Sequence, residues 1–378
     1  MLLDQSEKHA LQIQRLATKL FNDDLAPTIE KAYKAARAIL RQYDELSGIG
    51  QRNAILKAIE VAVTEQYAQA WQSVTDELEA FAVYEAGYYA ALMSKVTEFA
   101  FSVPAKDKIQ AYINKSLMSL ESGQKVTAGT WAEFIKQNTD EAVTTYQNIV
   151  KSAYANNQTV QQATKRMQFA SEGLLKHHAE GLVRNGLQHY STQARLAFRD
   201  DNLNVITREV PSTVWDNRRS LTCTAIQSKY GQKGWPVKQS PVGYPPYHYG
   251  GCRTQILFLV KDQDELEGTR TATLGESGQA AKEAYEEKAG RTDGKVVYKG
   301  RKDLNIFDVE QIKANSNVDA IMRAQPLWYI ESALGKTRAR LFLDGKLKLS
   351  SFADASGRPL SIKELRALDA RAFEDAGL

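Results

Sequence analysis

The chain has 378 residues, a length typical of two to three domains, and 43% of them are hydrophobic, so it can bury a sizeable core. Lys and Arg total 49 against 45 Asp and Glu, and the net charge of +4 excludes a nucleic-acid binder that acts through bulk charge, although not a local basic patch. Two cysteines exclude a disulfide-dense secreted scaffold and an all-cysteine zinc site.

The N-terminal sequence predicts neither a signal peptide nor a membrane anchor. The first residues, MLLDQSEKHALQIQRL, include acids and lack the apolar core of about seven or more residues that a signal peptide needs. No stretch approaches the roughly 18 consecutive apolar residues of a membrane-spanning helix. We therefore expect no membrane partner, and folding in a cytoplasm.

Residues 1 to about 200 are predicted to be mostly helical. Only Pro27 and Pro104 precede Pro211, and helix interiors exclude proline. Apolar side chains recur at steps of three and four, as in a helix with one buried face. One such stripe consists of Leu78, Phe81, Tyr84, Tyr88 and Leu92. Glu77 and Glu85 lie near its edges, so its amphipathicity is imperfect.

Breaks between these helices are expected near residues 47–50, 103–105 and 123–129. A turn precedes Thr159, which is a predicted N-cap of a helix that runs toward residue 198. His177, His178 and His189 lie on that helix. No Glu-x-x-His or His-x3-His ligand pattern accompanies them, so we interpret them as solvated or half-buried helix residues.

The composition changes after residue 203. NVITREV, at 204–210, and QILFLV, at 255–260, are predicted to be short strands. The window 213–256 between them holds four of the nine prolines, both cysteines, six aromatic residues, six basic residues and one acid. A surface rich in Tyr, Trp and Arg suits a protein interface, and a basic one suits DNA phosphates; we favour contact with protein. The candidate contact residues are Arg218, Lys229, Lys233 and Lys238.

The rest of the chain is predicted to be a linker and a small C-terminal unit. Residues 261–302 are polar and poor in large apolar side chains, which indicates a linker. Residues 303–378 contain a turn signal at Asp344-Gly345 and a capping-box spacing from Ser361 to Glu364. The predicted fold class is α+β: a helical N-terminal region (1–128), a helix plus β-hairpin module (129–260), the linker and a small C-terminal α+β unit, which we expect to be structural.

One constellation within the β-rich window combines residue types that carry chemistry. Its first part is Trp215-Asp216-x-x-Arg219-x3-Cys223, a turn from Gly231 to Trp235 follows, and its last part is Pro245-Pro246-x-His248-x3-Cys252-Arg253. We interpret it as a compact β-hairpin with long loops, in which Asp216 forms a bidentate ion pair with Arg219 or Arg253. Cys223, His248 and Cys252 are expected to converge where the second strand returns.

This order of residues resembles the head-morphogenesis domain of tailed bacteriophages, a family that includes minor head proteins similar to phage Mu protein F. The resemblance covers about residues 130–260. The positions that match the motif are Trp215, Asp216, Arg219, Cys223, Pro246, His248, Cys252 and Arg253. The resemblance implies a non-enzymatic minor head protein without a cofactor, in the virion or, during assembly, in the host cytoplasm. Its implied partners are the portal protein, the major capsid protein and packaged DNA.

The sequence also departs from the family pattern. Cys223 is followed by Thr224-Ala225-Ile226 rather than by a nearby second cysteine, and Thr254 stands where a further cysteine is usual. Three residues rather than two separate His248 from Cys252. These differences do not support a zinc site with four protein ligands.

Several interpretations of Cys223, His248 and Cys252 stay open. We favour buried structural thiols beside a hydrogen-bonded histidine. A zinc ion with these three ligands and a fourth of another kind is an alternative, as are a Cys223–Cys252 disulfide and an activated Cys–His pair. An alternative function is a metal-dependent nucleic-acid enzyme with a degenerate His/Cys nuclease-like module and His248 as general base. No paired carboxylates lie near it in the sequence, which counts against this function.

Overall fold

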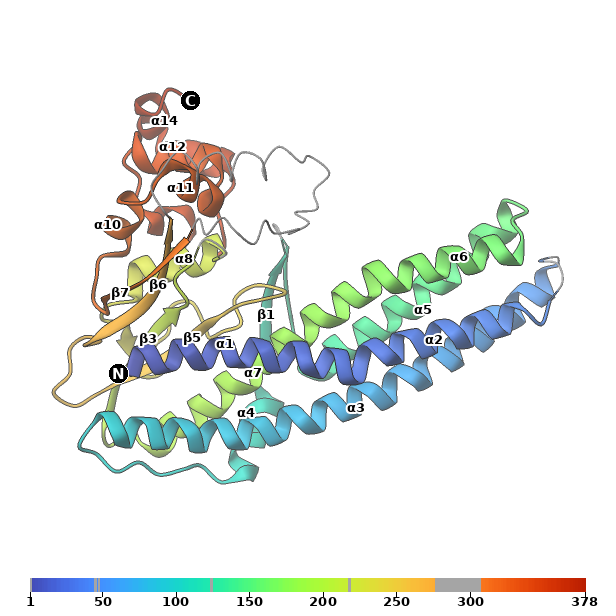
Figure 1. Cartoon of the computed structure of the whole chain (residues 1–378), viewed down its shortest axis with the longest axis horizontal. Coiled ribbons are helices and arrows are strands. Elements are labelled where there is room, and N and C mark those ends of the chain that lie inside the picture. The colour runs from blue at the N-terminus through green and yellow to red at the C-terminus, as the bar shows by residue number, and fades with distance from the viewer. Residues whose placement is uncertain (1, 44–45, 47, 123–124, 217–218, 276–306) are drawn as a thin grey trace.

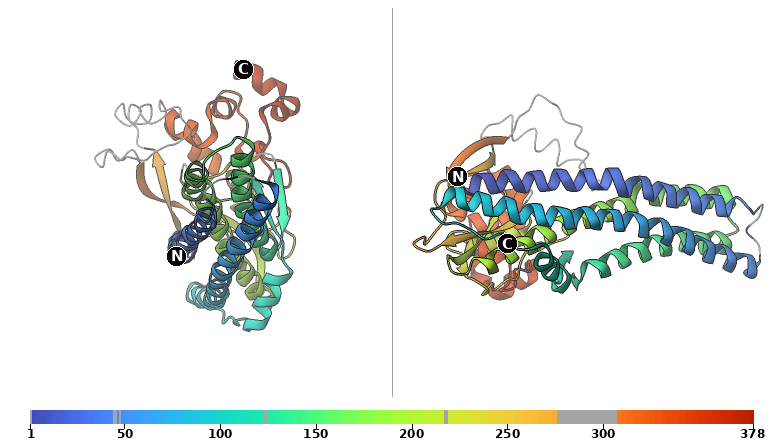
Figure 2. Two further views of the ribbon diagram at one scale, coloured as in Figure 1. Left: turned by 90° about the vertical axis from the view of Figure 1, so that its right-hand side faces the viewer. Right: turned by 90° about the horizontal axis from the view of Figure 1, so that it is seen from below.

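The computed structural model describes residues 2–43, 46, 48–122, 125–216, 219–275 and 307–378. A long helical bundle extends to one side of a more compact body that contains the β-sheets and the C-terminal helices (Figure 1). Seen from below, the bundle runs along the length of the molecule (Figure 2, right). The fold is therefore α+β with a mainly helical first half, as the sequence predicts.

The bundle consists of helices that run along the long axis of the molecule. They are α1 (Leu2–Leu20), α2 (Ala26–Leu40), α3 (Ile49–Val96), α5 (Trp131–Ala155), α6 (Val160–Ala170) and α7 (Lys176–Asp201). A π-helical turn, η1 (Phe21–Leu25), joins α1 to α2, and a second, η2 (Ser171–Leu175), joins α6 to α7. The turn η1, between α1 and α2, packs against α7, and the turn η2, between α6 and α7, packs against α2. Each π turn therefore contacts a helix of the other pair.

The helical spacing of apolar residues explains the bundle. In α3, Ile55, Ile59 and Val63 recur every four residues, are fully buried, and pack in a core shared with α2, α5 and α7. Helix α7 differs, since residues 185–199 are buried on every side. A helix buried all round lies at the centre of its fold. The far end of α7 enters the β module, where Phe198 packs against Phe258.

The predicted breaks and the predicted cap are found, and one break has additional structure. The chain leaves α2 at Leu40 and enters α3 at Ile49, and residues 97–105 are irregular before α4 (Lys106–Lys115). Thr159 caps α6 by accepting a hydrogen bond from the backbone N–H of Gln162. The break near 123–129 lies in an antiparallel hairpin of β1 (Met118–Ser122) and β2 (Lys125–Gly129), which the helical pattern did not predict. Helices on both sides of the boundary expected at 128/129 share one core.

Both predicted strands pair in the β module. Strand β3 (Ile206–Thr213) lies between β4 (Trp235–Pro236) and β5 (Thr254–Val260) in an antiparallel sheet. Every residue of β5 is buried, because the strand contacts α1 and α7 as well as β3. Helix α8 (Leu221–Tyr230) packs on β3. The segment between β3 and β5 thus contains α8, the edge strand β4 and the loop to residue 253.

The C-terminal unit begins earlier than expected. Within the predicted linker, β6 (Thr269–Gly275) pairs antiparallel with β7 (Phe307–Lys313), so this part of the linker is a strand; residues 276–302 lie outside the described residues. The strand forms in spite of its polar sequence because Arg270 is buried and donates hydrogen bonds to Glu7 and to the carbonyl oxygen of Thr213.

Short helices complete this unit around a core of its own. They are α10 (Val318–Arg323), α11 (Leu327–Leu334), α12 (Lys336–Leu343), the 3-10 turn η3 (Leu349–Phe352), α13 (Ile362–Leu368) and α14 (Ala370–Asp375). Ser361 and Glu364 form the predicted capping box at the start of α13. Trp215, from the β module, is part of this core. In the described part of the chain, no helix is both long and apolar enough to cross a bilayer.

Candidate functional site

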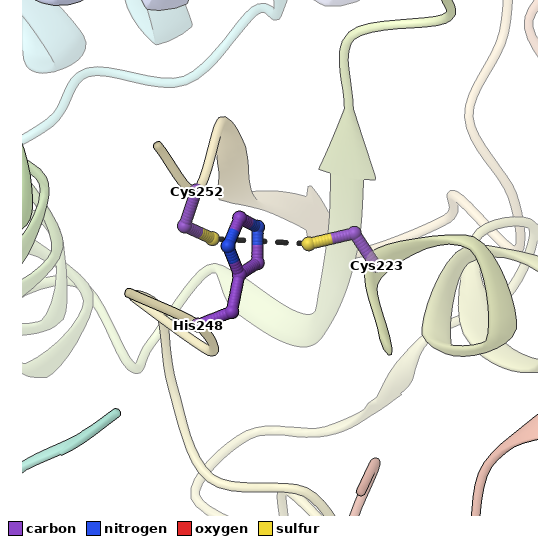
Figure 3. Close-up of side chains that lie close together, drawn as sticks. All are labelled: Cys223, His248 and Cys252. Atoms are coloured by element: carbon purple, nitrogen blue, oxygen red, sulfur yellow. Dashed lines mark hydrogen bonds between the residues drawn. The ribbon is translucent and has the colours of Figure 1, made fainter. Parts of the chain in front are cut away.

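The structure brings Cys223, His248 and Cys252 together at one end of the β module, as the sequence predicts (Figure 3). Cys223 lies in the first turn of α8, where its N–H donates a hydrogen bond to the capping hydroxyl of Ser220. Cys252 precedes β5, and His248 comes from the loop before it. Their candidate ligand atoms all lie within 4.8 Å of one another. Both thiols are buried and the imidazole is half-buried.

The two sulfur atoms lie 3.8 Å apart and differ electrostatically. The hydrogen bond between the two sulfur atoms and the nearby imidazole of His248 hold the pKa of Cys223 well below its usual value, although burial acts in the other direction. Burial raises the pKa of Cys252 well above its usual value. The pair therefore favours one thiolate, at Cys223, and one thiol.

An apolar shell and backbone donors surround this group. Ile226 and Tyr247 pack with the two cysteines in a small buried cluster. The N–H of Tyr247 donates to the sulfur of Cys252 at 3.4 Å. Nδ1 of His248 lies 3.3 Å from the carbonyl oxygen of Tyr249, within hydrogen-bond distance. The loop is therefore held by polar contacts at the point where the three side chains meet. Pro246, the remaining motif residue of this loop, is buried directly before Tyr247.

The charged residues of the motif are held by contacts within the β module. Both guanidinium nitrogens Nη1 and Nη2 of Arg253 donate to the carboxylate of Asp216, at 2.5 and 2.7 Å, which is the bidentate pair expected from the sequence. Burial disfavours the charge on Arg253, but Asp216 more than offsets this and raises the pKa of Arg253. Arg219 is not part of this pair. It stacks on the ring of Trp215 at 3.8 Å, and burial lowers its pKa to about 10.

The candidate contact residues form a less positively charged surface than the number of basic residues in the sequence suggests. Arg218 lies outside the described residues. Lys229 and Lys233 are exposed, and Lys238 forms an ion pair with Asp200 at 3.0 Å. Because Arg219 is buried and the half-buried Arg253 is paired with Asp216, two of the six basic residues in the window are not free surface charges. This arrangement weakens the case for contact with DNA phosphates.

Two buried charge networks were missed by sequence reasoning. In the first, Glu85 of α3 contacts Arg195 of α7 and His9 of α1, at 2.7 and 2.5 Å. In the second, Glu209 of β3 accepts hydrogen bonds from Arg199 and from the indole of Trp235, both at 2.5 Å. For the first network the sequence offers one signal, since Glu85 lies near the edge of an apolar helical stripe. The second network shows no local signal.

Chemically, two thiols and an imidazole can bind a soft metal ion, form a disulfide or pair as nucleophile and base. The cluster contains no carboxylate, and Asp216, the acid of this window, is paired with Arg253. None of the protein-family models, curated proteins or solved structures with which the chain was compared matches it.

Proposed function

We propose that this chain is a minor head protein of a tailed bacteriophage, which binds beside the portal and acts in procapsid assembly, DNA packaging or DNA ejection. The observation that carries the proposal is that residues of the head-morphogenesis-like motif contact one another. Asp216 pairs with Arg253, and Cys223 with Cys252, across 37 and 29 positions of the chain. These contacts support the interpretation of the motif as one structural unit.

The shape of the molecule supports a binding function. The bundle extends away from the β module and offers long helical surfaces to a neighbouring protein (Figure 1). Large apolar side chains are exposed on it: Phe169 of α6 is 79% exposed, Ile49 of α3 is 70% exposed and Val61 of α3 is 58% exposed. Apolar area of this kind stabilises a complex when a partner covers it. The portal protein and the major capsid protein are the proposed partners, with the virion and the host cytoplasm as locations.

The alternative of a metal-dependent nucleic-acid enzyme has less support. His248 lies beside two sulfur atoms, whereas Mg²⁺ and similar catalytic ions prefer oxygen ligands. Of the candidate contact residues that the structure describes, Lys238 is paired with Asp200, which leaves Lys229 and Lys233. Packaged DNA is therefore proposed as a neighbour of the protein in the capsid, and not as its substrate.

Co-purification tests the proposed function. The full-length chain is expressed together with the portal and major capsid proteins of the same phage, and the complexes are separated by size exclusion. We expect the chain to elute with the portal ring. Elution as a lone monomer, together with divalent-metal-dependent cleavage of DNA that His248→Ala abolishes, would instead establish the enzyme.

A matched pair of variants tests whether the bundle makes the contact. Phe169→Ser removes an exposed apolar side chain from α6, and we expect it to reduce co-elution with the portal ring several-fold. Lys165→Ser changes an exposed residue of the same helix and should leave co-elution unchanged. Far-UV circular dichroism of both variants establishes that the helices are intact. Equal co-elution of the two variants would place the contact elsewhere on the molecule.

A further inference from the structure

We propose that Cys223, His248 and Cys252 bind one zinc ion, which ties the loop directly before β5 to the first turn of α8. The site is structural and goes beyond the proposed function in head assembly. In this chain it has three protein ligands, because no fourth Cys, His, Asp or Glu ligand atom joins the group in the described residues. A tetrahedral zinc ion then takes its fourth ligand from outside this group, for instance a water molecule.

The sulfur atoms are already separated as zinc requires. Two thiolates at the usual Zn–S distance of about 2.3 Å in a tetrahedral site lie about 3.8 Å from each other. The sulfur atoms of Cys223 and Cys252 are 3.8 Å apart. The imidazole nitrogen completes a triangle of donor atoms whose sides do not exceed 4.8 Å. Small side-chain rotations therefore suffice to place all three donors on one ion.

The hydrogen bonds around the ligands are those that a metal site needs. Nδ1 of His248 lies within hydrogen-bond distance of the carbonyl oxygen of Tyr249, and a donated bond there leaves Nε2 as the metal-binding nitrogen. The N–H of Tyr247 donates to the sulfur of Cys252, which stabilises a thiolate. Orienting bonds of this kind are characteristic of metal-binding histidines and cysteines.

The charges also balance around zinc. Two thiolates neutralise a divalent ion, and the nearby positive charge of Arg253 is already compensated by Asp216. Sulfur and imidazole ligands select zinc over Mg²⁺ or Ca²⁺, which prefer oxygen. Ile226 and Tyr247 pack around the two sulfur ligands in an apolar shell. Donor type, spacing, hydrogen bonding and charge thus agree on the same ligand.

A zinc ion would explain how the loop keeps its conformation. Between α8 and β5, the only strand in the described residues is β4, with two residues. Loops of this length have few backbone hydrogen bonds to fix them. The ion would connect the loop, through His248 and Cys252, to helix α8, through Cys223. Removal of zinc should therefore loosen the β module while leaving the helical bundle folded.

Metal analysis of the purified full-length chain tests the proposal. The chain is expressed in zinc-supplemented medium, dialysed and analysed by inductively coupled plasma mass spectrometry. We expect about one zinc per chain. Cys223→Ser, Cys252→Ser and His248→Gln should each reduce the zinc content several-fold. His177→Gln, at an exposed histidine of α7, is the matched control and should retain it.

Two measurements on the unmutated chain keep the test independent of misfolded variants. Replacement of zinc by Co²⁺ should give the intense visible absorption of a tetrahedral ion with sulfur ligands. A strong chelator should lower the midpoint of thermal unfolding, and added zinc should restore it. A chain without zinc, with both thiols titratable after denaturation, would overturn the proposal in favour of structural thiols. A chain without zinc or titratable thiols would overturn it in favour of a disulfide. Neither result depends on binding to a portal.

Discussion

Glu85 shows how a single residue can organise several helices. Its carboxylate is fully buried and accepts hydrogen bonds from Arg195 at 2.7 Å and Ser191 at 2.9 Å, and it contacts His9 at 2.5 Å. Burial alone would raise the pKa of Glu85, but Arg195 and His9 more than offset this and lower it to about 2. The carboxylate is therefore charged at neutral pH, and it ties α1, α3 and α7 together.

Glu85→Gln is expected to destabilise the protein strongly. The variant leaves the buried guanidinium of Arg195 without its counter-charge, and breaking a buried pair of this kind costs about 3–5 kcal/mol. The free energy of unfolding, measured by urea denaturation, checks this. Glu30→Gln is the matched control, because Glu30 pairs with Lys34 on the exposed face of α2 and should be nearly silent. Similar losses from both variants would contradict a central role for Glu85.

His189 is expected to make stability depend on pH. It is buried in α7 beside the hydroxyl of Ser116, and burial lowers its pKa from 6.5 to about 4. Between these values the unfolded chain binds a proton that the folded chain does not. The free energy of unfolding should therefore be highest above pH 6.5 and fall as the pH decreases toward 4, by up to about 3 kcal/mol from this residue.

The variant His189→Gln isolates this effect. Unfolding by urea is followed at several pH values from 7 to 4, for the wild type and for the variant. The difference between their free energies of unfolding should shrink as the pH falls, because only the wild type loses stability through His189. A constant difference across this range would show that His189 is not held neutral in the fold.

At residue level, the sequence predicts contacts within a short motif better than contacts between distant segments. The Asp216–Arg253 pair and the meeting of Cys223 with Cys252 follow from one constellation of 39 positions, 215–253. The partners of Glu85, in contrast, lie 76 and 110 positions away. No local spacing encodes a pair at that distance, because it depends on how whole helices pack. An acid at the edge of an apolar stripe indicates that the carboxylate has a partner, but not which residue that partner is.

At the level of elements, helices with an apolar stripe and a side-chain cap are predicted well. The N-cap predicted at Thr159 and the capping box predicted at Ser361 both mark helix starts in the structure. Strands β3 and β5 are predicted because they are rich in β-branched and apolar residues. Hairpin β1–β2 and strand β6 are missed, because their polar sequences resemble loops. Tertiary partners, such as Glu7 for Arg270, decide the conformation of such segments.

The close packing of α7 against α3 and α5 can be tested by a substitution at a glycine. At Gly186, an added Cβ would lie 2.6 Å from the ring of Trp131 and 3.1 Å from Leu78, so the helices could not stay as close. Gly186→Ala should destabilise the chain by about 1–3 kcal/mol, in spite of the better helix propensity of alanine.

A second glycine supplies the control. At Gly87 of α3, an added Cβ would meet nothing within 4 Å. Gly87→Ala should therefore stabilise the protein by up to about 1 kcal/mol, through helix propensity alone. The midpoints of thermal unfolding of both variants decide the matter. A stabilised Gly186→Ala chain would mean that Trp131 moves aside without cost.

For the whole molecule, the bundle and the sheets do not form separate bodies. Tyr89 of α3 and Phe198 of α7 pack edge-on and face-on against Phe258 of β5 in one core. Trp215 of the β module is shared with the C-terminal core. Boundaries drawn from composition divide the sequence, but the packing crosses them. Composition reports what a segment is made of, whereas the core depends on which segments meet.

The pairing of Glu7 with Arg270 also bears on the order in which contacts can form while the chain is being synthesised. The two residues are 263 positions apart, and ribosomes add roughly 5–20 residues per second. Glu7 therefore leaves the ribosome roughly 13–50 s before Arg270 does. Burial raises the pKa of Glu7 to about 7 even with Arg270 beside it, so burial without that partner is less favourable still. Helix α1 is among the first segments to be made, yet the buried partner of its Glu7 is available only after strand β6 has been translated.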